Sequence, residues 1–403
     1  MSQQDFPVIN HEMSVGGLTI SQLAHIVGQT PFYVYDRELI TRRIKQLRKL
    51  LPSEVHIHYA MKANPMPAVV CHLAQLVDGI DVASGEELVV ALSAGAQPKH
   101  MSFAGPGKRD IELEQATASQ VLINVESETE LFRLAQISKA LKIKPRIALR
   151  VNPDFELKMS GMKMGGGPKQ FGIDAEAIPN ILKQLPSLPL NFEGFHIFAG
   201  SQNLKPEAII ESQIKSFELA LRLAQNTQTP LQHLNLGGGF GIPYFSNEQE
   251  LDITSIAKNL ADLNEKLKQQ YPQAHLTIEL GRYLVGEAGL YICQIVEKKI
   301  SRGQTYLVVD GGMHHHLAAS GHFGQVIRKN FPVTIANKVD TLETELVSVV
   351  GPLCTPMDLL ADQMDLPKAD VGDYVAILQS GAYGFSASPQ LFLSHPRPRE
   401  ILI

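Results

Sequence analysis

Cysteine is scarce in this chain, and the few cysteines present are far apart. Only three occur among 403 residues, at Cys71, Cys293 and Cys354. Their number is odd and no two form a CxxC pair, so they indicate neither a disulfide framework nor a typical zinc site. We therefore expect reduced thiols in a cytoplasmic protein.

The chain also lacks a strong excess of charge and any long hydrophobic run. The formal net charge is −5 with both signs interspersed, which argues against nucleic acid or an anionic membrane surface as a partner. No apolar run is long enough to cross a bilayer, and residues 1–6 lack the features of a signal peptide. No tandem repeat or low-complexity tract is visible.

What the chain does contain is a regular alternation of strand-like and helix-like segments. Two of the helical segments follow capping-box patterns, Ser84 to Glu87 and Ser127 to Glu130. Eight strands separated by helices predict an α/β fold, a (β/α)8 TIM barrel rather than an open sheet. The predicted strands are 55–61, 79–82, 101–104, 121–125, 146–151, 193–198, 232–236 and 276–280.

Beyond about residue 284 the helix-like segments give way to strand-like segments joined by turns. These predict an all-β domain. The strand-like segment from Pro31 to Tyr35 has no place in the barrel count, so we assign it to the same domain. The predicted domains are thus a barrel over 35–284 and a β domain built from 1–34 with 285–403. Its predicted strands after the barrel are 290–295, 305–309, 333–335, 345–350 and 374–378.

The first predicted barrel strand ends on a lysine. Apolar residues alternate with polar or small ones up to Lys62, and Asn64-Pro65 then stops the strand. A lone lysine at a strand end is usually a solvated surface residue. At the C-terminal strand ends, however, barrel enzymes carry their active sites, and a desolvated lysine amine is a good imine former.

The other predicted strand ends collect polar residues and glycines. The glycine run 237–241 follows the seventh strand, where barrels bind phosphate through backbone N–H groups, although as a bare pattern it is equally a tight turn. No Lys-Ser/Thr pair follows it, so a nucleotide-binding P-loop is not indicated. The remaining candidates lie at the C-terminal strand ends or just beyond them: Asp81, Ser84 and Glu87 at strand two, Arg150 at strand five, His196, Phe198, Gly200 and Ser201 at strand six, and Glu279, Gly281 and Arg282 at strand eight.

Three short segments of the predicted β domain are ambiguous by themselves. Cys354 is more simply a small buried hydrophobe than a catalyst, and Tyr383 lies in an ordinary glycine-rich turn. The triplet His314, His315 and His316 suggests a metal at first sight. Adjacent residues on a strand point to opposite faces, however, so we predict no metal site there.

Taken together and in this order, the motifs resemble the pyridoxal-phosphate-dependent decarboxylases of the ornithine and diaminopimelate decarboxylase family (fold type III). The resemblance covers about residues 31–398, and its anchor is the sequence Tyr-Ala-Met-Lys-Ala-Asn around Lys62. It implies an alanine-racemase-like barrel, a Greek-key β barrel or sandwich, pyridoxal 5′-phosphate as cofactor, and a homodimer with shared active sites.

The resemblance also implies a role for each matching residue. Lys62 would hold the cofactor as a Schiff base, Glu279 would keep its pyridine nitrogen protonated so that it accepts electrons better, and the partner's Cys354 would protonate the substrate α-carbon. The implied cofactor contacts are Asp81, Glu87, Arg150, Phe198, Ser201, Gly238, Gly239, Gly281, Arg282 and Tyr383. The implied substrate contacts are Arg282, Thr355, Asp358 and Tyr383.

Several positions depart from the family pattern. Phe198 stands where relatives stack a histidine on the cofactor ring, which leaves the role of His196 open. Thr355 stands where diamino-acid enzymes carry an acid, and no Arg-Pro pair follows the turn at 310–313. The Met/Gly/Lys-rich segment 159–172 looks like an active-site lid. In these details the chain is similar to the exosortase-associated and the carrier-protein-acting (butirosin-type) branches.

We therefore predict a decarboxylase that removes the α-carboxylate of an L-amino acid or of an aminoacyl group on an acyl carrier protein. The alternative is a diaminopimelate or other free diamino-acid decarboxylase. An amino-acid racemase is disfavoured, since racemases of this fold resemble one another in carrying an arginine where Glu279 stands. A non-catalytic decarboxylase-like binding protein is disfavoured because Lys62 and Cys354 are both present.

Overall fold

The chain folds into two compact units. The computed structural model describes residues 5–156, 162–163, 165–245, 247–323, 325 and 328–403. One unit, the barrel unit, comprises Arg43–Ile242 and Glu250–Tyr283. The other, the β unit, comprises Met1–Arg42, Pro243–Gln249 and Leu284–Ile403.

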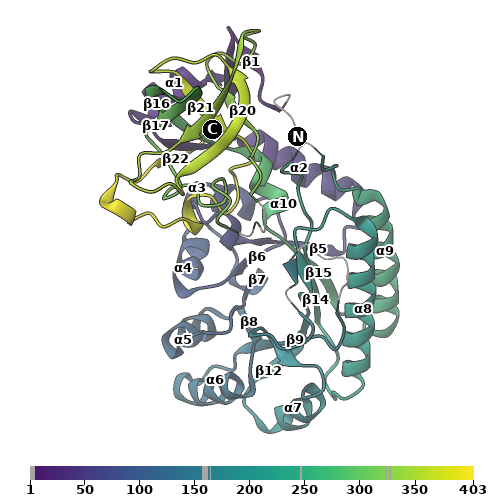
Figure 1. The fold of residues 1–403 in the computed structure, drawn as a ribbon. Helices are drawn as coiled ribbons and strands as arrows, with labels where there is room; N and C mark the ends of the chain where they lie inside the picture. Colours follow the sequence, from purple (N-terminus) through teal and green to yellow (C-terminus); the bar gives the residue numbers. More distant parts are fainter. Residues whose placement is uncertain (1–4, 157–161, 164, 246, 324, 326–327) are drawn as a thin grey trace. The chain divides into compact units, whose positions relative to one another are not determined.

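The barrel unit is a closed ring of eight parallel strands (Figure 1). Neighbouring strands pair in parallel along the ring, and β8 pairs with β9 to close it. The predicted (β/α)8 barrel is confirmed. The strands are β5 Val55–Ala60, β6 Gly79–Val82, β7 Met101–Phe103, β8 Leu122–Val125, β9 Arg146–Asn152, β12 Asn191–His196, β14 His233–Gly238 and β15 His275–Leu280.

Helices follow the strands and cover the ring from outside (Figure 1). Two begin as the capping patterns predict: the Ser84 hydroxyl accepts from the Glu87 N–H, and the Ser127 hydroxyl accepts from the Glu130 N–H, each at 3.1 Å. Such caps satisfy backbone donors that a helix start leaves open. The helices are α3 Pro67–Ala74, α4 Gly85–Ser93, α5 Asp110–Ser119, α6 Glu128–Leu141, α7 Ile178–Gln184, α8 Pro206–Ala224 and α9 Ile253–Gln270.

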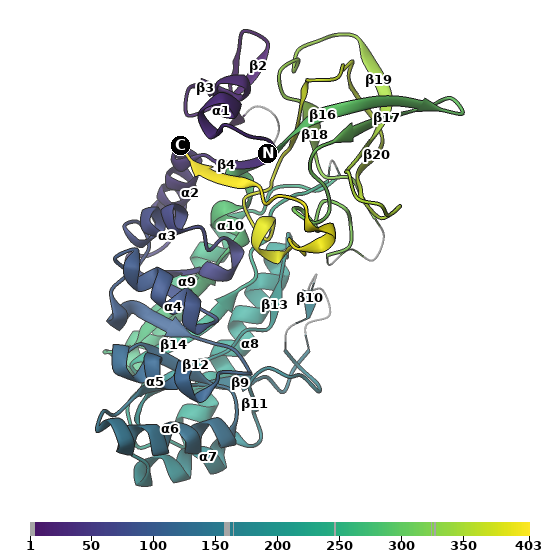
Figure 2. The ribbon, with the colours of Figure 1, turned by 90° about the vertical axis from the view of Figure 1, so that its left-hand side faces the viewer.

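The β unit is built around one mixed sheet, which confirms the predicted all-β domain. Its strand order is β18-β21-β16-β17-β19-β20, with β4 paired to both β16 and β22. Figure 2 shows β16 and β17 running together as a long hairpin. The strands are β4 Phe32–Tyr35, β16 Gly289–Ser301, β17 Gln304–Val309, β18 Val333–Ile335, β19 Thr344–Val350, β20 Leu359–Pro367, β21 Tyr374–Ile377 and β22 Arg399–Leu402.

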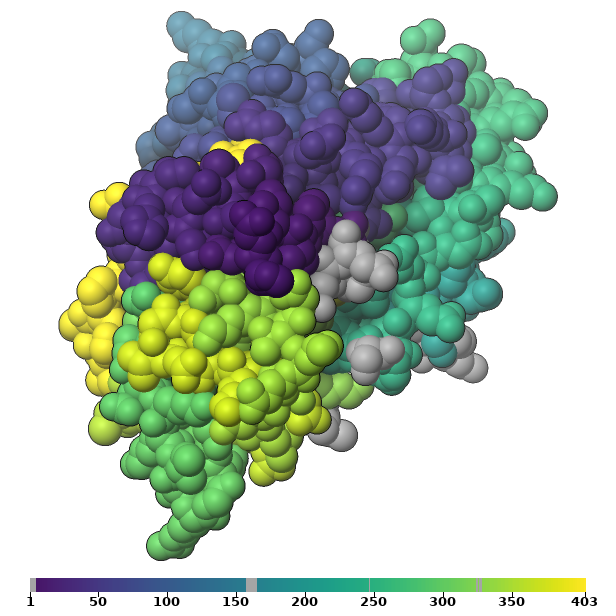
Figure 3. Space-filling model, turned by 90° about the horizontal axis from the view of Figure 1, so that it is seen from above, coloured from purple at the N-terminus to yellow at the C-terminus, as the bar shows by residue number. Residues whose placement is uncertain are grey.

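Both ends of the chain belong to this β unit. Strand β4 pairs with β22 in parallel and with β16 in antiparallel orientation. A small sheet of β1 Val8–Ile9, β2 Glu12–Val15 and β3 Leu18–Thr19 precedes helix α1, Ile20–Val27. Figure 3 shows the N-terminal segment, in purple, beside C-terminal residues in yellow.

The observed division differs from the predicted domain boundary. A boundary between residues 34 and 35 would cut β4, whose last residue is Tyr35. The start of helix α2, Arg37–Leu50, and the loop Pro243–Gln249 also cluster with the β unit. The sequence prediction missed β20 and β22. Register shifts in the β19–β20 pairing blur the two-residue alternation of β20, and β22 has only four residues.

All three cysteines are free, with Cys71 and Cys354 exposed and Cys293 buried. None of the described helices combines the length and hydrophobicity that crossing a membrane requires.

Candidate active site

Lys62 lies just beyond the C-terminal end of β5, in the short turn Met61–Ala63. The prediction that the strand reaches Met61 is wrong by one residue, because the Asn64 N–H already bonds to the Met61 carbonyl at 3.1 Å. The Tyr59 hydroxyl donates to the Asn64 carbonyl at 2.8 Å and stiffens the turn. The Lys62 side chain is exposed, and its Nζ lies 5.7 Å from the centre of the Phe198 ring. The amine therefore stands at the barrel end where such enzymes act.

Each of the eight barrel strands carries a buried polar side chain. Buried polar groups are costly unless they are paired, so a complete set of them in a barrel core indicates a functional interior. We call these eight residues the polar ring: His58, Asp81, Ser102, Asn124, Arg150, His196, Asn235 and Glu279.

One part of the polar ring is a chain of contacts that starts at His58. Its Nδ1 lies 2.9 Å from Oδ1 of Asp81, the same oxygen that accepts from the Ser102 hydroxyl at 2.6 Å. The Asn124 amide donates to Ser102 in turn at 3.2 Å. The other oxygen of Asp81, Oδ2, is buried and has no hydrogen-bond partner among the described residues. Asp81 thus keeps one acceptor open for a ligand.

A second part of the polar ring surrounds Glu279. Its Oε1 accepts a 2.9 Å hydrogen bond from the Asn235 amide and lies 3.1 Å from Nε2 of His196. Burial alone would raise the pKa of Glu279. His196 and the positive charges of Lys62 and Arg150 outweigh that effect and hold this pKa well below its ordinary value. Glu279 is therefore a buried carboxylate that stays ionised.

Two members of this group were not assigned from the sequence. The structure gives His196, whose role was open, a place beside Glu279. Asn235 was missed altogether. Its signal was present, since it is a polar residue between Leu234 and Leu236, two positions before Gly237.

The guanidinium group of Arg150 is held by contacts within the barrel unit. Its Nη1 donates to Oε1 of Glu126 at 2.7 Å, and its guanidinium lies 4.9 Å from the centre of the Phe171 ring. Glu126 also accepts from the Gly105 and Gly172 N–H groups at 2.7 and 2.8 Å. The predicted cofactor contact by Arg150 stays a prediction, and what the structure adds is this anchoring.

The glycines after β14 and β15 leave no room for side chains. A Cβ on Gly238 would come within 1.8 Å of the Glu279 carbonyl oxygen, and one on Gly239 within 2.5 Å of the Gly200 carbonyl oxygen. Gly237 and Gly239 also have φ of +69° and +80°, which favours glycine. A Cβ on Gly281 would press on Ala63, in the lysine turn, at 2.9 Å. Bare backbone N–H groups in such a loop suit a phosphate.

Ser201 and Arg282 flank this loop. Ser201 belongs to β13, Gly200–Ser201, which pairs with β10, Met162–Lys163. Arg282 opens the short helix α10, Arg282–Val285, directly after Gly281. Both residues therefore follow barrel strands at their C-terminal ends, as their predicted roles require.

The predicted lid 159–172 is partly described. Residues 159–161 and 164 lie outside the described residues. In the described part, the Gly166 N–H donates to the Asn152 side chain at 3.0 Å, and that side chain donates to the Gly167 carbonyl at 2.9 Å. The glycine-rich half of the segment is thus anchored to the end of β9, and movement of a lid stays a prediction.

In the β unit, Cys354 and Thr355 lie on a loop that Asp358 holds together. Cys354 is exposed and Thr355 is half-buried. Asp358 is 2% exposed, and its two oxygens accept from the Met313 N–H at 2.6 Å and the Leu353 N–H at 2.9 Å. Both carboxylate oxygens therefore accept hydrogen bonds from backbone N–H groups, and the substrate contact predicted for Asp358 stays a prediction.

The histidine triplet lies in a turn, so the strand geometry used to argue against a metal there was wrong. The rings of His314 and His315 are only 3.6 Å apart. The ring nitrogens of His315 contact the Tyr291 hydroxyl at 3.1 Å and the Pro396 carbonyl at 2.9 Å. His316 contacts the Ser380 hydroxyl at 2.9 Å. The last two histidines are therefore used in packing this unit.

Tyr383 lies in the turn that follows β21 and Ser380. Its φ is +53°, a conformation that is uncommon outside glycine. It is half-buried, and its ring centre lies 6.3 Å from that of Phe323. Uncommon backbone conformations of this kind are frequent at functional sites. The predicted contact of Tyr383 with cofactor and substrate stays a prediction.

The barrel unit fits the cofactor that the sequence predicts. An amine at Lys62 suits a Schiff base with pyridoxal phosphate, a buried ionised carboxylate at Glu279 suits its pyridine nitrogen, and a side-chain-free glycine loop suits its phosphate. The open oxygen of Asp81 adds a buried acceptor.

Comparisons with known proteins point the same way. A family model described as "Pyridoxal-dependent decarboxylase, pyridoxal binding domain" matches residues 37–286. The chain is 39% identical over 384 residues to the L-glutamyl-[BtrI acyl-carrier protein] decarboxylase of Niallia circulans, which covers 93% of this chain and 89% of that protein. It is 31% identical over 378 residues to the 2-[(L-alanin-3-ylcarbamoyl)methyl]-2-hydroxybutanedioate decarboxylase of Staphylococcus aureus, which covers 92% and 93%.

A solved structure matches the chain along its full length. The diaminopimelate decarboxylase of M. jannaschii in complex with L-lysine superposes with a TM-score of 0.90 at 28% identity. The match covers all of this chain (100%) and 94% of that one.

Proposed function

Because this chain belongs to the family of pyridoxal-dependent decarboxylases, we propose that its substrate is an aminoacyl group carried by an acyl carrier protein. The protein is a pyridoxal-phosphate-dependent amino-acid decarboxylase. The proposal concerns the form of the substrate, an aminoacyl group with an acidic or amide-linked side chain. It is supported by the 39% identity to a decarboxylase of glutamyl carrier protein.

The observation that carries the proposal is that Asp358 is buried and that backbone N–H groups bind both of its carboxylate oxygens. A free diamino acid brings a second ammonium group, which needs a countercharge in a desolvated site. Thr355 offers only a hydroxyl. Asp358, three residues on, is buried with both oxygens bonded to backbone N–H groups. Gly312 and Gly351 pack so closely that a Cβ on either would clash with this carboxylate. Neither residue of the loop is free to pair with a distal ammonium group.

The chain's own residues have distinct proposed tasks in the reaction. Pyridoxal phosphate, when bound, supplies an electron sink for the pair left when CO₂ departs. Lys62 would hold the cofactor covalently, and the glycine loop with Ser201 and Arg282 would hold its phosphate. Glu279 would keep a proton on the facing ring nitrogen, since its own pKa lies well below the ordinary carboxylate value. His196 and Asn235 keep that carboxylate in position.

We also propose a homodimer with shared sites, in which the partner's Cys354 delivers a proton to the substrate α-carbon. The exposed position of Cys354 supports this role, since a buried thiol could not reach a substrate. Mixing inactive Lys62→Ala and Cys354→Ala chains should restore activity, because one site of each heterodimer keeps both residues. No recovery after verified subunit exchange would contradict shared sites.

A cytoplasmic location is part of the same proposal. Three unpaired cysteines suit a reducing compartment. Fractionation of cells that produce the protein tests it, and recovery with the periplasm or membranes would contradict it.

The deciding experiment measures CO₂ release by the cofactor-loaded enzyme. The substrates are L-glutamyl carrier protein, free L-glutamate, meso-diaminopimelate and L-ornithine. We expect kcat/KM for the carrier-bound substrate to exceed that for the free diamino acids by about a hundredfold or more, the effect of a few kcal/mol for an unpaired buried charge. Efficient turnover of meso-diaminopimelate or ornithine would overturn the proposal.

A matched pair of variants sharpens this test. Thr355→Asp adds a carboxylate beside Cys354 and should raise turnover of ornithine at least about tenfold, the effect of roughly 1.4 kcal/mol. Thr344→Asp adds the same charge at an exposed position of β19 and should change nothing. Equal responses of the two variants would show that the loop does not choose the substrate.

The second candidate is decarboxylation of free diaminopimelate. It is favoured by the TM-score of 0.90 to the M. jannaschii diaminopimelate decarboxylase. We rank it second because neither Asp358, whose oxygens accept backbone hydrogen bonds, nor Thr355, which has only a hydroxyl, offers a countercharge for the second ammonium group.

A further inference from the structure

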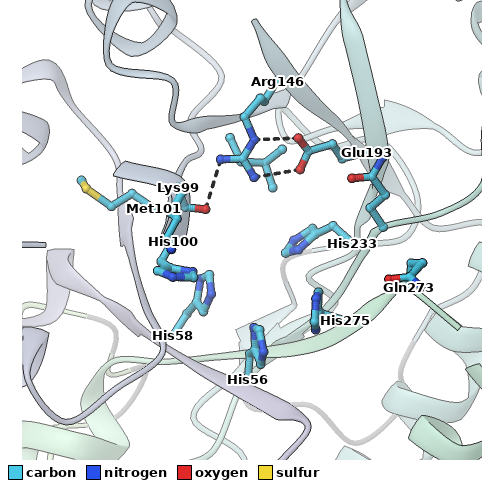
Figure 4. Close-up of a pocket in the computed structure, with 12 residues that line it drawn as sticks. His56, His58, Lys99, His100, Met101, Arg146, Glu193, His233, Gln273 and His275 are labelled. Carbon is cyan, nitrogen blue, oxygen red and sulfur yellow. Dashed lines mark hydrogen bonds and ion pairs between the residues drawn. The ribbon is translucent and has the colours of Figure 1, made fainter. Parts of the chain in front are cut away.

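A cavity of about 340 Å³ lies at the opposite end of the barrel from Lys62, where the strands begin. His233 and His275 are the first residues of β14 and β15, and His56 is the second residue of β5. Figure 4 shows the imidazole rings gathered around one space. We call it the histidine cavity, after the five histidines that line it: His56, His58, His100, His233 and His275.

The charged pair in the wall of this cavity is already satisfied. Glu193 is the one carboxylate among the lining residues. It accepts two hydrogen bonds from Arg146, at 2.6 and 2.9 Å, which neutralise both groups. Arg146 also donates to the carbonyls of Lys99 and Gln120 at 3.1 Å each. The charge left in the wall is positive, because the Lys99 ammonium is the remaining permanent ion among the lining residues.

One of the histidines has a buried nitrogen without a partner. His233 is 9% exposed, and its Nε2 makes no hydrogen bond within the described residues. Figure 4 shows its ring directed into the space between the other labelled side chains. A buried polar nitrogen normally finds a partner, and leaving it unpaired costs free energy. The cavity thus holds a group that is prepared for a ligand.

The arrangement does not suit a metal ion. No three His, Cys, Asp or Glu side chains converge as ligands anywhere in the described ranges. The rings of His56 and His275 are stacked, with centres 4.6 Å apart and planes at 21°, so their nitrogens do not aim at one point. What remains are imidazole N–H groups, the amides of Gln232 and Gln273, and an ammonium. Such donors recognise an anion.

Burial sets the charge of the histidines in the absence of an anion. It lowers the pKa of His56 to about 4, an effect that neighbouring histidines strengthen and Asp78 partly offsets. It also lowers the pKa values of His100, His233 and His275. For His58, burial acts the same way, but the charge and hydrogen bond of Asp81 outweigh it and raise the pKa. The charged and titratable groups that face this cluster are Asp78, Asp81, Lys99, Arg146, Glu193, His196, Lys268 and Glu279.

We propose that the histidine cavity binds a small oxyanion, and that binding loads protons onto its histidines. A negative charge among the rings reverses the effect of burial, because it stabilises the imidazolium form. Protons taken up on binding make the affinity rise as the pH falls. His58 lines this cavity, and its Nδ1 lies 2.9 Å from Oδ1 of Asp81 in the polar ring, so one side chain links the anion to that ring.

The experiment titrates sulfate into the cofactor-loaded enzyme, in which the cofactor occupies the phosphate loop. Sulfate keeps its charge across pH 6 to 8, so any pH dependence belongs to the protein. Calorimetry in two buffers of different ionisation enthalpy counts the protons taken up. For each proton bound, we expect the Kd to become about tenfold smaller when the pH is lowered by one unit. At pH 7 the enzyme should take up about one proton or more per sulfate bound. Affinity that does not change with pH would overturn the proposal.

Variants locate the binding. His233→Gln keeps a hydrogen-bonding amide but cannot be protonated, and it should weaken sulfate binding about tenfold and remove part of the proton uptake. His56→Gln and His275→Gln test the same rim at less buried positions, in case the first variant folds poorly. His25→Gln, on α1 of the β unit, is the matched control. Unchanged binding in all three cavity variants would place the sulfate elsewhere and overturn the proposal, as would binding of Zn²⁺ at micromolar concentration with release of protons.

Discussion

The two ends of the barrel are built on the same strands and carry opposite chemistry. Along β14, His233 lines the histidine cavity, Asn235 belongs to the polar ring, and Gly237 begins the glycine loop predicted to hold phosphate. Along β15, His275 lines the cavity and Glu279 is in the polar ring. The spacing of two or four residues follows from the strand, in which every second side chain shares a face. One inward-facing row of a strand therefore serves both ends.

The two ends also treat buried charge differently. At the catalytic end, His196, Lys62 and Arg150 outweigh the burial of Glu279, so the carboxylate stays ionised. At the other end burial lowers the pKa of His233, the positive charges of His58, His196 and Arg146 add to this effect, and Glu279 offsets only part of it, so this pKa lies well below the ordinary value. Burial disfavours the charged form of a side chain at both ends. A buried group therefore stays charged only where opposite charges close to it outweigh the effect of burial.

The largest effect is expected at the catalytic end, from Lys62→Ala. The variant should lose the borohydride-reducible link to the cofactor, and kcat should fall by about three orders of magnitude or more, as for other residues that act covalently. Visible absorption before and after borohydride treatment measures the link. Lys49→Ala, on helix α2, is the control. A mutant that keeps a reducible link would show that another lysine carries the cofactor.

Glu279→Gln should have the next largest effect. It removes the buried negative charge but keeps the shape, so kcat should fall by roughly a hundredfold, the scale of one preorganised electrostatic group. The apo-protein offers a second readout. A carboxyl whose pKa is depressed by folding stabilises the fold above the unfolded pKa, and this stabilisation is lost as the pH falls through the folded value. As the pH is lowered from about 5 towards about 2, the unfolding midpoint should therefore fall less in the variant than in the native chain. Equal slopes would contradict the ionised state of Glu279.

Gly281→Ala tests how tightly the end of β15 packs on the lysine turn. The added Cβ would meet Ala63 at 2.9 Å, so the turn that carries Lys62 must shift. Overpacking of this kind costs about 1–3 kcal/mol, and cofactor affinity should weaken about tenfold while the fold remains. Fluorescence titration of the cofactor measures it. Gly107→Ala, at an exposed turn position where no atom lies within 4 Å of the new Cβ, is the control. Unchanged affinity in the Gly281 variant would show that the turn adapts freely.

The smallest effect on catalysis is expected at the amino-terminal end, from Glu193→Gln. It breaks the half-buried pair with Arg146 and should lower the free energy of unfolding by about 1–3 kcal/mol. The cofactor absorption and kcat should stay within about twofold, because this end of a barrel supports stability. A large loss of kcat without a loss of stability would break the distinction between the two ends.

The sequence by itself determined the barrel and most of the catalytic end. Eight strands follow from local alternation and helix caps, and Lys62, Glu279 and the glycine loop follow from their positions at the C-terminal ends of those strands. The same reasoning indicated the β domain from its run of strands. These features are local, because strand period, proline stops and caps depend on neighbours within a few residues.

Only the tertiary structure decided which polar groups meet. His196 lies beside Glu279, 83 positions away in the chain. Asp358 accepts hydrogen bonds from the nearby Leu353 and from Met313, which is 45 positions away. The histidine cavity joins residues from 56 to 275, brought together when the ring closes. Closure places strand starts at one end and strand ends at the other regardless of their separation in the chain. Sequence patterns carry no information on such pairings, because each partner alone is an ordinary polar residue.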